Sequence, residues 1–148
     1  MNGGTDMNAD ADADARAGTE RELQARAGAC LSLYDIEVRV EQDGSLGFAY
    51  EGVLSSLRAV SLAPGLDVLT LTCVLAWDRP LKPQLHKRVA ERNNSLQFGS
   101  LTIIAREKLA DVILRYTFPA AGLDDQALAT MLVLVLSGAG KARQGLLP

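Results

Sequence analysis

The chain has few of the residues that usually mark a metal-binding, redox-active or catalytic protein. It contains two cysteines and one histidine in 148 residues. Cys30 and Cys73 have no Cys-x-x-Cys or cysteine–histidine spacing around them, which excludes the common zinc and redox motifs. We therefore predict two buried free thiols, no disulfide, no metal site and no cofactor.

Long hydrophobic runs are also missing. The longest, Met131–Leu136, is far shorter than the roughly 20 apolar residues that cross a bilayer. Residues 1–18 have neither the basic start nor the apolar centre of a secretory signal. We therefore expect no membrane-spanning segment and a cytoplasmic location.

The sequence has no excess of positive charge, since 18 acidic residues face 15 basic ones and the net charge is −3. No long-range field attracts nucleic acid, so nucleic acid is an unlikely partner. Residues 79–92 are locally basic, and we name four of them the basic patch, a candidate partner-facing surface: Lys82, Lys87, Arg88 and Arg92. A solvated outer helix face explains the same charges more simply.

Two fragments of known motifs are incomplete, and the single histidine belongs to no catalytic motif. Asp10-x-Asp12-x-Asp14 has the spacing that begins a calcium loop but lacks its glycine and its final glutamate. The segment 138–141 lacks the first glycine and the Ser or Thr of a phosphate loop. His86 has no nucleophile motif beside it in the sequence. We therefore predict no catalytic residue and interpret the chain as non-enzymatic.

The ends of the chain differ in composition from the middle. Residues 1–18 have almost no large apolar side chain, which predicts a disordered acidic tail. Thr19 and Glu22 have the spacing of a capping box, which predicts a helix from about 20 to about 32. We expect a single α+β domain over 19–144 and a short tail over 145–148.

The first half of that domain reads as antiparallel strands. Residues 35–40 alternate in polarity, and Asp43-Gly44 is typical of a tight hairpin turn into a strand over 46–50. The segment 53–62 indicates a short strand or an irregular crossing before Pro64-Gly65. Residues 66–77 are apolar at nearly every position, which predicts a central strand covered on both faces.

The second half predicts a helix over 83–94, strands over 98–105 and 108–118 with a turn at Glu107-Lys108, and a last helix from Asp124-Asp125 to about Ser137. Hairpin-joined strands with single helices between them favour an α+β fold with an antiparallel sheet over repeated βαβ units.

The last helix is apolar most of the way round, so it must be covered on more than one side. One sheet covers one side in a chain of this size, which leaves two interpretations, an interface or a deep internal position. We predict an interface formed by Leu128, Met131, Leu132 and Val135.

The second half resembles the YbjN-like proteins, with which the type III secretion chaperones share a fold. The matching segments are Asn93–Leu101, Val112–Tyr116, Phe118-Pro119 and Gly122–Asp124, followed by the Leu-rich helix. The resemblance spans about residues 20–142. It implies the order α-β-β-β-α-β-β-α and a domain, often a homodimer, that binds polypeptides or takes part in regulation without chemistry of its own.

The leading hypothesis is a homodimeric module whose apolar groove or exposed strand receives a segment of another polypeptide. A type III secretion chaperone for an effector is one alternative. A small-ligand sensor is another, with His86, Asn93, Asn94 and Arg115 as its candidate polar groups. The sequence does not identify the partner.

Overall fold

The computed structural model describes residues 3–146, which form one six-stranded sheet and three helices. The elements are α1 (Gly3–Ser32), β1 (Arg39–Val40), β2 (Leu46–Tyr50), β3 (Val53–Ala63), β4 (Leu66–Pro80), α2 (Pro83–Ser95), β5 (Ser100–Arg106), β6 (Leu109–Pro119) and α3 (Asp125–Leu146). The strand order is β1-β2-β3-β4-β6-β5, with every neighbouring pair antiparallel. The predicted α+β class and antiparallel sheet are confirmed.

Short turns join the paired strands, as their sequences predict. Pro64-Gly65 connects β3 to β4, and Glu107-Lys108 connects β5 to β6 through the pair Arg106 and Leu109. Gly44 and Gly65 have positive φ angles of 86° and 77°, a region that glycine reaches without steric strain. These turns set the register of the strands that follow them.

β3 and β4 form the centre of the sheet. The weak strand expected over 53–62 is an 11-residue strand that pairs with β4 over most of its length. β4 buries alternate residues such as Leu69, Leu71 and Cys73, while Thr70 and Thr72 on its other face are half-buried. The expectation that both faces of β4 are covered is therefore wrong, because the helices pack on one face.

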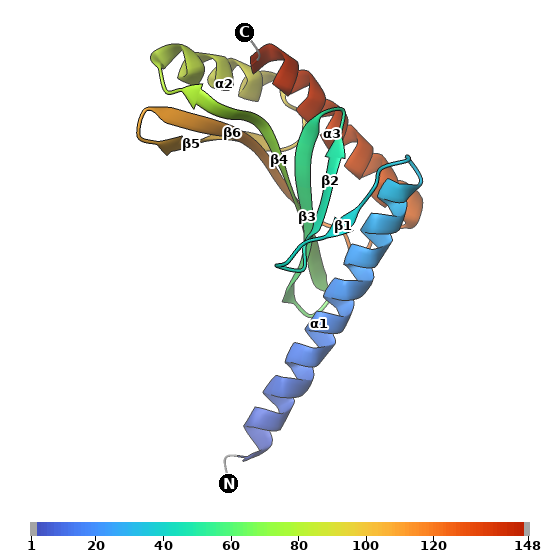
Figure 1. Cartoon of the computed structure of the whole chain (residues 1–148). Helices are drawn as coiled ribbons and strands as arrows, with labels where there is room; N and C mark the ends of the chain where they lie inside the picture. Colours follow the sequence, from blue (N-terminus) through green and yellow to red (C-terminus); the bar gives the residue numbers. More distant parts are fainter. Residues whose placement is uncertain (1–2, 147–148) are drawn as a thin grey trace.

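All three helices lie on the same side of the sheet (Figure 1). α3 crosses β4 and has α1 against one flank and α2 against the other. The core between this layer and the sheet contains the largest fully buried side chains, among them Phe48, Leu57, Leu71, Leu114 and Leu136. The second face of the sheet faces solvent, as is common for antiparallel sheets.

α1 begins at Gly3 instead of near residue 20, so residues 3–18 are helical where the composition predicted disorder. Residues 9–16 are exposed, and the Thr19 hydroxyl donates to the Arg16 carbonyl inside the helix instead of capping its start. The many alanines favour the helix, and aspartates suit its N-terminal end. Residues 1–2 of the expected tail lie outside the described residues.

α3 extends to Leu146, well beyond the predicted end near Ser137. The buried stripe simply continues through Ala139, Ala142 and Leu146 at helical spacing. Packing of this stripe outweighs the low helix propensity of Gly138 and Gly140. The expected tail over 145–148 is thus helical up to 146, and 147–148 lie outside the described residues.

Candidate functional site

The predicted interface residues of α3 are mostly core residues. Leu128, Leu132 and Val135 are 0%, 1% and 1% exposed, and Met131 is half-buried against the same core. Their side chains are covered by the chain's own sheet and by α1 and α2, which flank α3. Leu128, Leu132 and Val135 therefore belong to the core of this chain, and interpreting them as an interface was wrong because α1 and α2 cover the flanks of α3. Met131 keeps part of its side chain accessible. Leu134 is the large apolar residue that α3 exposes, at 45%.

The basic patch is exposed on and beside α2, but its members do not act as one site. Lys82 and Arg88 line a shallow hollow together with Arg79, while Lys87 is exposed and is not part of that lining. The Arg92 side chain instead points toward α3, where it lies against Gly145. The structure therefore divides the basic patch between two places.

The edge strand β5 is partly blocked by one side chain. The Asn93 amide accepts a hydrogen bond from the Leu101 N–H at 2.7 Å and donates to the Leu101 carbonyl at 3.2 Å. At the start of β5, the Asn93 amide thus makes the two hydrogen bonds that the backbone of a neighbouring strand would make. It lies on the side of β5 that faces away from β6.

Beyond Leu101 this edge has no partner within residues 3–146. Backbone N–H and C=O groups alternate between the two sides of a strand, so Ile103 and Ala105 direct theirs to the same side as Leu101. Thr102, Ile104, Ala105 and Arg106 are exposed, and Ile104 is 43% exposed. β5 therefore offers a short, unpaired edge on which Ile104 and Ala105 are exposed apolar residues.

The opposite end of the sheet is protected. β3 extends past β2, and there its outward N–H groups at Ala59 and Ser61 donate to the Gln24 and Glu20 side chains of α1. The outermost strand, β1, has only two residues. The outermost strand at this end is thus much shorter than β5, which has seven residues.

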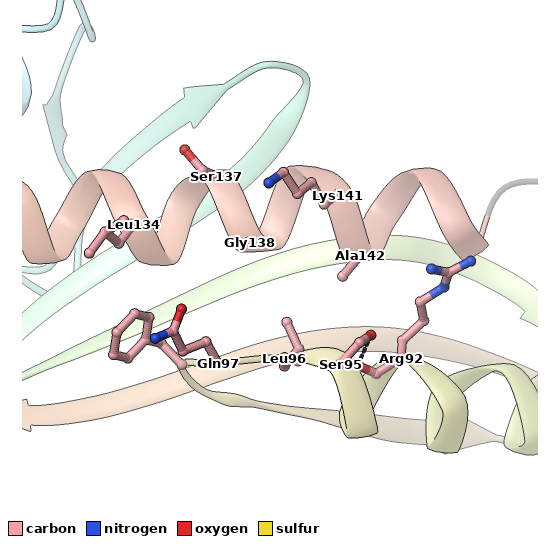
Figure 2. Close-up of a pocket in the computed structure, with 10 residues that line it drawn as sticks. Arg92, Ser95, Leu96, Gln97, Leu134, Ser137, Gly138, Lys141 and Ala142 are labelled. Atoms are coloured by element: carbon pink, nitrogen blue, oxygen red, sulfur yellow. Dashed lines mark hydrogen bonds between the residues drawn. The ribbon is translucent and has the colours of Figure 1, made fainter.

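A cleft of about 370 Å³ lies between α3 and the segment that links α2 to β5 (Figure 2). Figure 2 shows Leu134 and Ala142 of α3 on the side that faces Leu96 and Gln97. The complete lining is Arg92, Ser95, Leu96, Gln97, Phe98, Leu134, Ser137, Gly138, Lys141 and Ala142. The cleft combines apolar walls with hydroxyl, amide and cationic groups.

Both charged groups in the cleft are cations. Arg92 comes from the last turn of α2 and Lys141 from α3. Within the described part of the chain neither makes an ion pair. Sequence reasoning missed Lys141, and the apolar stripe that continues past Ser137 is the signal that could have placed it on a helix.

The polar groups considered for a small-ligand pocket do not converge. His86 is exposed on α2, and the Asn93 amide is already hydrogen-bonded to the backbone of β5. Arg115 lies on the helix-free face of the sheet, in a hollow with Thr72 and Thr117. No single cavity of the described chain brings these residues together, so a sensor site built from them has no support.

Both cysteines are buried free thiols, as predicted. Burial raises the pKa of the Cys73 thiol from 9.0 to about 11, although a hydrogen bond with Ser55 lowers it. Burial, followed by the charge of Asp125, also raises the pKa of the Cys30 thiol, and Arg26 opposes that shift. Thiols shifted in this direction are poor nucleophiles at neutral pH.

Among the side chains that the structure describes, no group of three or more potential metal ligands lies together. No helix in the same region is long and apolar enough to span a membrane.

Sequence comparisons give no relatives, since no family model matches the chain and no curated protein sequence is significantly similar. Solved structures do match. YbjN from E. coli, described as a putative transcription regulator, superposes with a TM-score of 0.59 at 12% identity, covering 78% of this chain and 84% of YbjN. An uncharacterized protein from Methanothermobacter thermautotrophicus gives 0.56 at 11% identity, covering 83% and 95%.

The type III secretion chaperone SycH of Yersinia pestis, solved in complex with a fragment of YscM2, gives a TM-score of 0.50 at 11% identity, covering 81% of this chain and 98% of SycH. At such identities the likeness concerns the fold alone. It confirms the resemblance inferred from the second half of the sequence at that level. The chain has the α+β fold of YbjN and of the type III secretion chaperone SycH.

Proposed function

We propose that this chain is a non-enzymatic module that binds an extended segment of another polypeptide, which adds as a strand to β5. The observation that carries the proposal is the unpaired edge at Ile103 and Ala105, next to the blocked position at Leu101. The opposite end of the sheet supports it, because its outermost strand has only two residues and two N–H groups of β3 are bonded to Glu20 and Gln24 of α1.

Strand addition explains both affinity and selectivity. The backbone groups of Ile103 and Ala105 supply main-chain hydrogen bonds that do not depend on the partner's sequence. Ile103 faces the helix side of the sheet, while Thr102 and Ile104 face the open side. Selectivity then comes from cross-strand contacts of an incoming segment with these side chains.

The finer alternatives from the sequence remain part of this proposal. SycH was solved with a polypeptide fragment, and YbjN is described as a putative regulator. Polypeptide binding is compatible with either role, as a secretion chaperone for an effector or as a YbjN-like regulator. A cytoplasmic homodimer also stays a proposal, and its interface must use residues other than Leu128, Leu132 and Val135.

A backbone substitution tests strand addition directly. Ala105→Pro removes the outward N–H of an exposed edge residue, whereas Ala105→Val keeps it and favours a strand. A photo-crosslinking amino acid placed at Thr102 in cells of the native host should capture a polypeptide in the wild-type and Ala105→Val backgrounds and lose it with Ala105→Pro. Adducts of equal yield in all three backgrounds would refute the proposal. Adducts with a second copy of the chain would place the homodimer at this edge.

A further inference from the structure

We propose that the cleft between α3 and residues 95–98 binds a carboxylate side chain of the partner polypeptide together with an adjacent large apolar side chain. This inference rests on the proposed polypeptide-binding function and specifies the chemistry of the bound segment. One wall of the cleft is formed by the residues just before β5, since Phe98 lies two residues before the first residue of that strand.

The size of the cleft fits side chains better than a whole structural element. Its volume of about 370 Å³ is near the lower end of the range of roughly 300–1,000 Å³ that small-ligand pockets occupy. Leu134, Leu96 and Phe98 give it apolar walls. Leu134 is 45% exposed, so covering it with a partner's apolar side chain removes more apolar surface from water.

The positive charge of the cleft favours a carboxylate as the group bound beside the apolar side chain. Arg92 and Lys141 enter from different helices, and the lining contains no carboxylate. An incoming carboxylate gains charge-assisted hydrogen bonds from a cation that makes no ion pair within the described part of the chain. Ser137 and Gln97 add neutral hydrogen-bonding groups to the same walls. Electrostatic complementarity therefore favours an acidic segment over a neutral or basic one.

Gly138 keeps the cleft open. A methyl group at Gly145 would overlap the Arg92 guanidinium, so the glycine there accommodates a close contact. At Gly138 the nearest atom to such a methyl group is Cδ2 of Leu96 at 4.0 Å, so packing does not require a glycine. A larger side chain at this position would instead occupy the space between α3 and Leu96.

Four fluorescein-labelled octapeptides in a Gly/Ser background test the chemistry by fluorescence anisotropy. They carry the pairs Leu-Asp, Leu-Asn, Leu-Lys and Ala-Asp. The Leu-Asp peptide should bind at least about tenfold more tightly than each of the others, and more weakly as salt rises. Equal affinity for Leu-Asp and Leu-Lys would overturn the proposal. So would binding of 4-methylpentanoate, a free carboxylate with the leucine skeleton, as tight as that of the Leu-Asp peptide.

Variants locate the binding. Lys141→Gln should weaken the Leu-Asp peptide about five- to tenfold, and Gly138→Leu should abolish its binding. Lys108→Gln, at an exposed turn outside the cleft, is the matched control and should bind normally. Lys141 is exposed, so its variant should fold even if Gly138→Leu does not. Unchanged affinity in Lys141→Gln would contradict the assignment.

Failure of this inference is distinguishable from failure of strand addition. Ala105→Pro alters only the β5 edge, so it should leave the Leu-Asp octapeptide bound while it removes the crosslink at Thr102. Loss of the crosslink without any octapeptide binding would refute the cleft alone. Octapeptide binding without a Pro-sensitive crosslink would refute strand addition alone.

Discussion

At the scale of single residues, Asn93 has the most specific role. Its one amide satisfies both backbone groups of Leu101, a buried residue at the start of an edge strand. The sequence resemblance includes Asn93 but does not reveal this role, because the contact depends on how α2 is placed against β5. A local pattern predicts the helix and the strand, and only their packing predicts the hydrogen bonds.

Asn93→Ala should lower the free energy of unfolding by about 1–3 kcal/mol, because two buried backbone groups lose their partner. Urea denaturation measures the change, and hydrogen exchange at the Leu101 N–H should become faster. The neighbouring Asn94→Ala is the control, since Asn94 is exposed. A loss of equal size at both positions would show that the amide contact is not responsible.

Cys73 predicts how stability depends on alkaline pH. Its thiol has a pKa of about 11 in the folded chain against an ordinary 9.0, because burial disfavours the thiolate. The unfolded chain therefore loses this proton at lower pH than the folded chain. The stabilisation is fully present below pH 9.0 and is lost as the pH rises to about 11.

Over that interval the free energy of unfolding of the wild type should fall by up to about 3 kcal/mol more than that of Cys73→Ala. Urea unfolding at several pH values in the interval measures both slopes. Using the difference between the two proteins removes the titration of lysines and tyrosines, which they share. Parallel slopes would mean that the Cys73 thiol does not control this loss.

At the scale of elements, α3 marks the limit of local signals. Gly138 and Gly140 are typical of a helix end, yet the helix continues because Ala139, Ala142 and Leu146 remain on its buried face. The same reasoning from composition missed the first half of α1. Propensity and breakers predict where a helix begins or ends only when tertiary packing does not decide otherwise.

The glycines of α3 therefore differ in what an alanine would do. Gly138→Ala should raise the free energy of unfolding by about 0.5–1 kcal/mol, since a methyl group there meets only an ordinary contact with Leu96. Gly145→Ala should raise the free energy of unfolding by less, because the Arg92 side chain must move away from the added methyl group. Thermal unfolding of the two variants provides the comparison. A loss of stability in Gly138→Ala would mean that α3 lies closer to Leu96 than the structure has it.

At the scale of the whole molecule, the sequence predicted the sheet well and the site poorly. Alternation, turn residues and Pro83 are local features, and they predicted most strands, three turns and α2. The open edge of β5 depends on β6 lying between β4 and β5, and the cleft depends on α3 crossing residues 95–98. Such relations join distant parts of the chain, so no single segment encodes them.

The burial of α3 separates a core role from an interface role for its apolar residues. Leu132→Asp should unfold the chain, because an unpaired carboxylate would enter a site that is 1% exposed, at a loss of more than about 3 kcal/mol. Leu134→Asp, on the same helix but 45% exposed, should keep the fold. Circular dichroism and sedimentation of both variants make the comparison. If Leu132→Asp stayed folded while its oligomeric state changed, α3 would have to be covered by a second chain, and the interface first inferred from its sequence would stand.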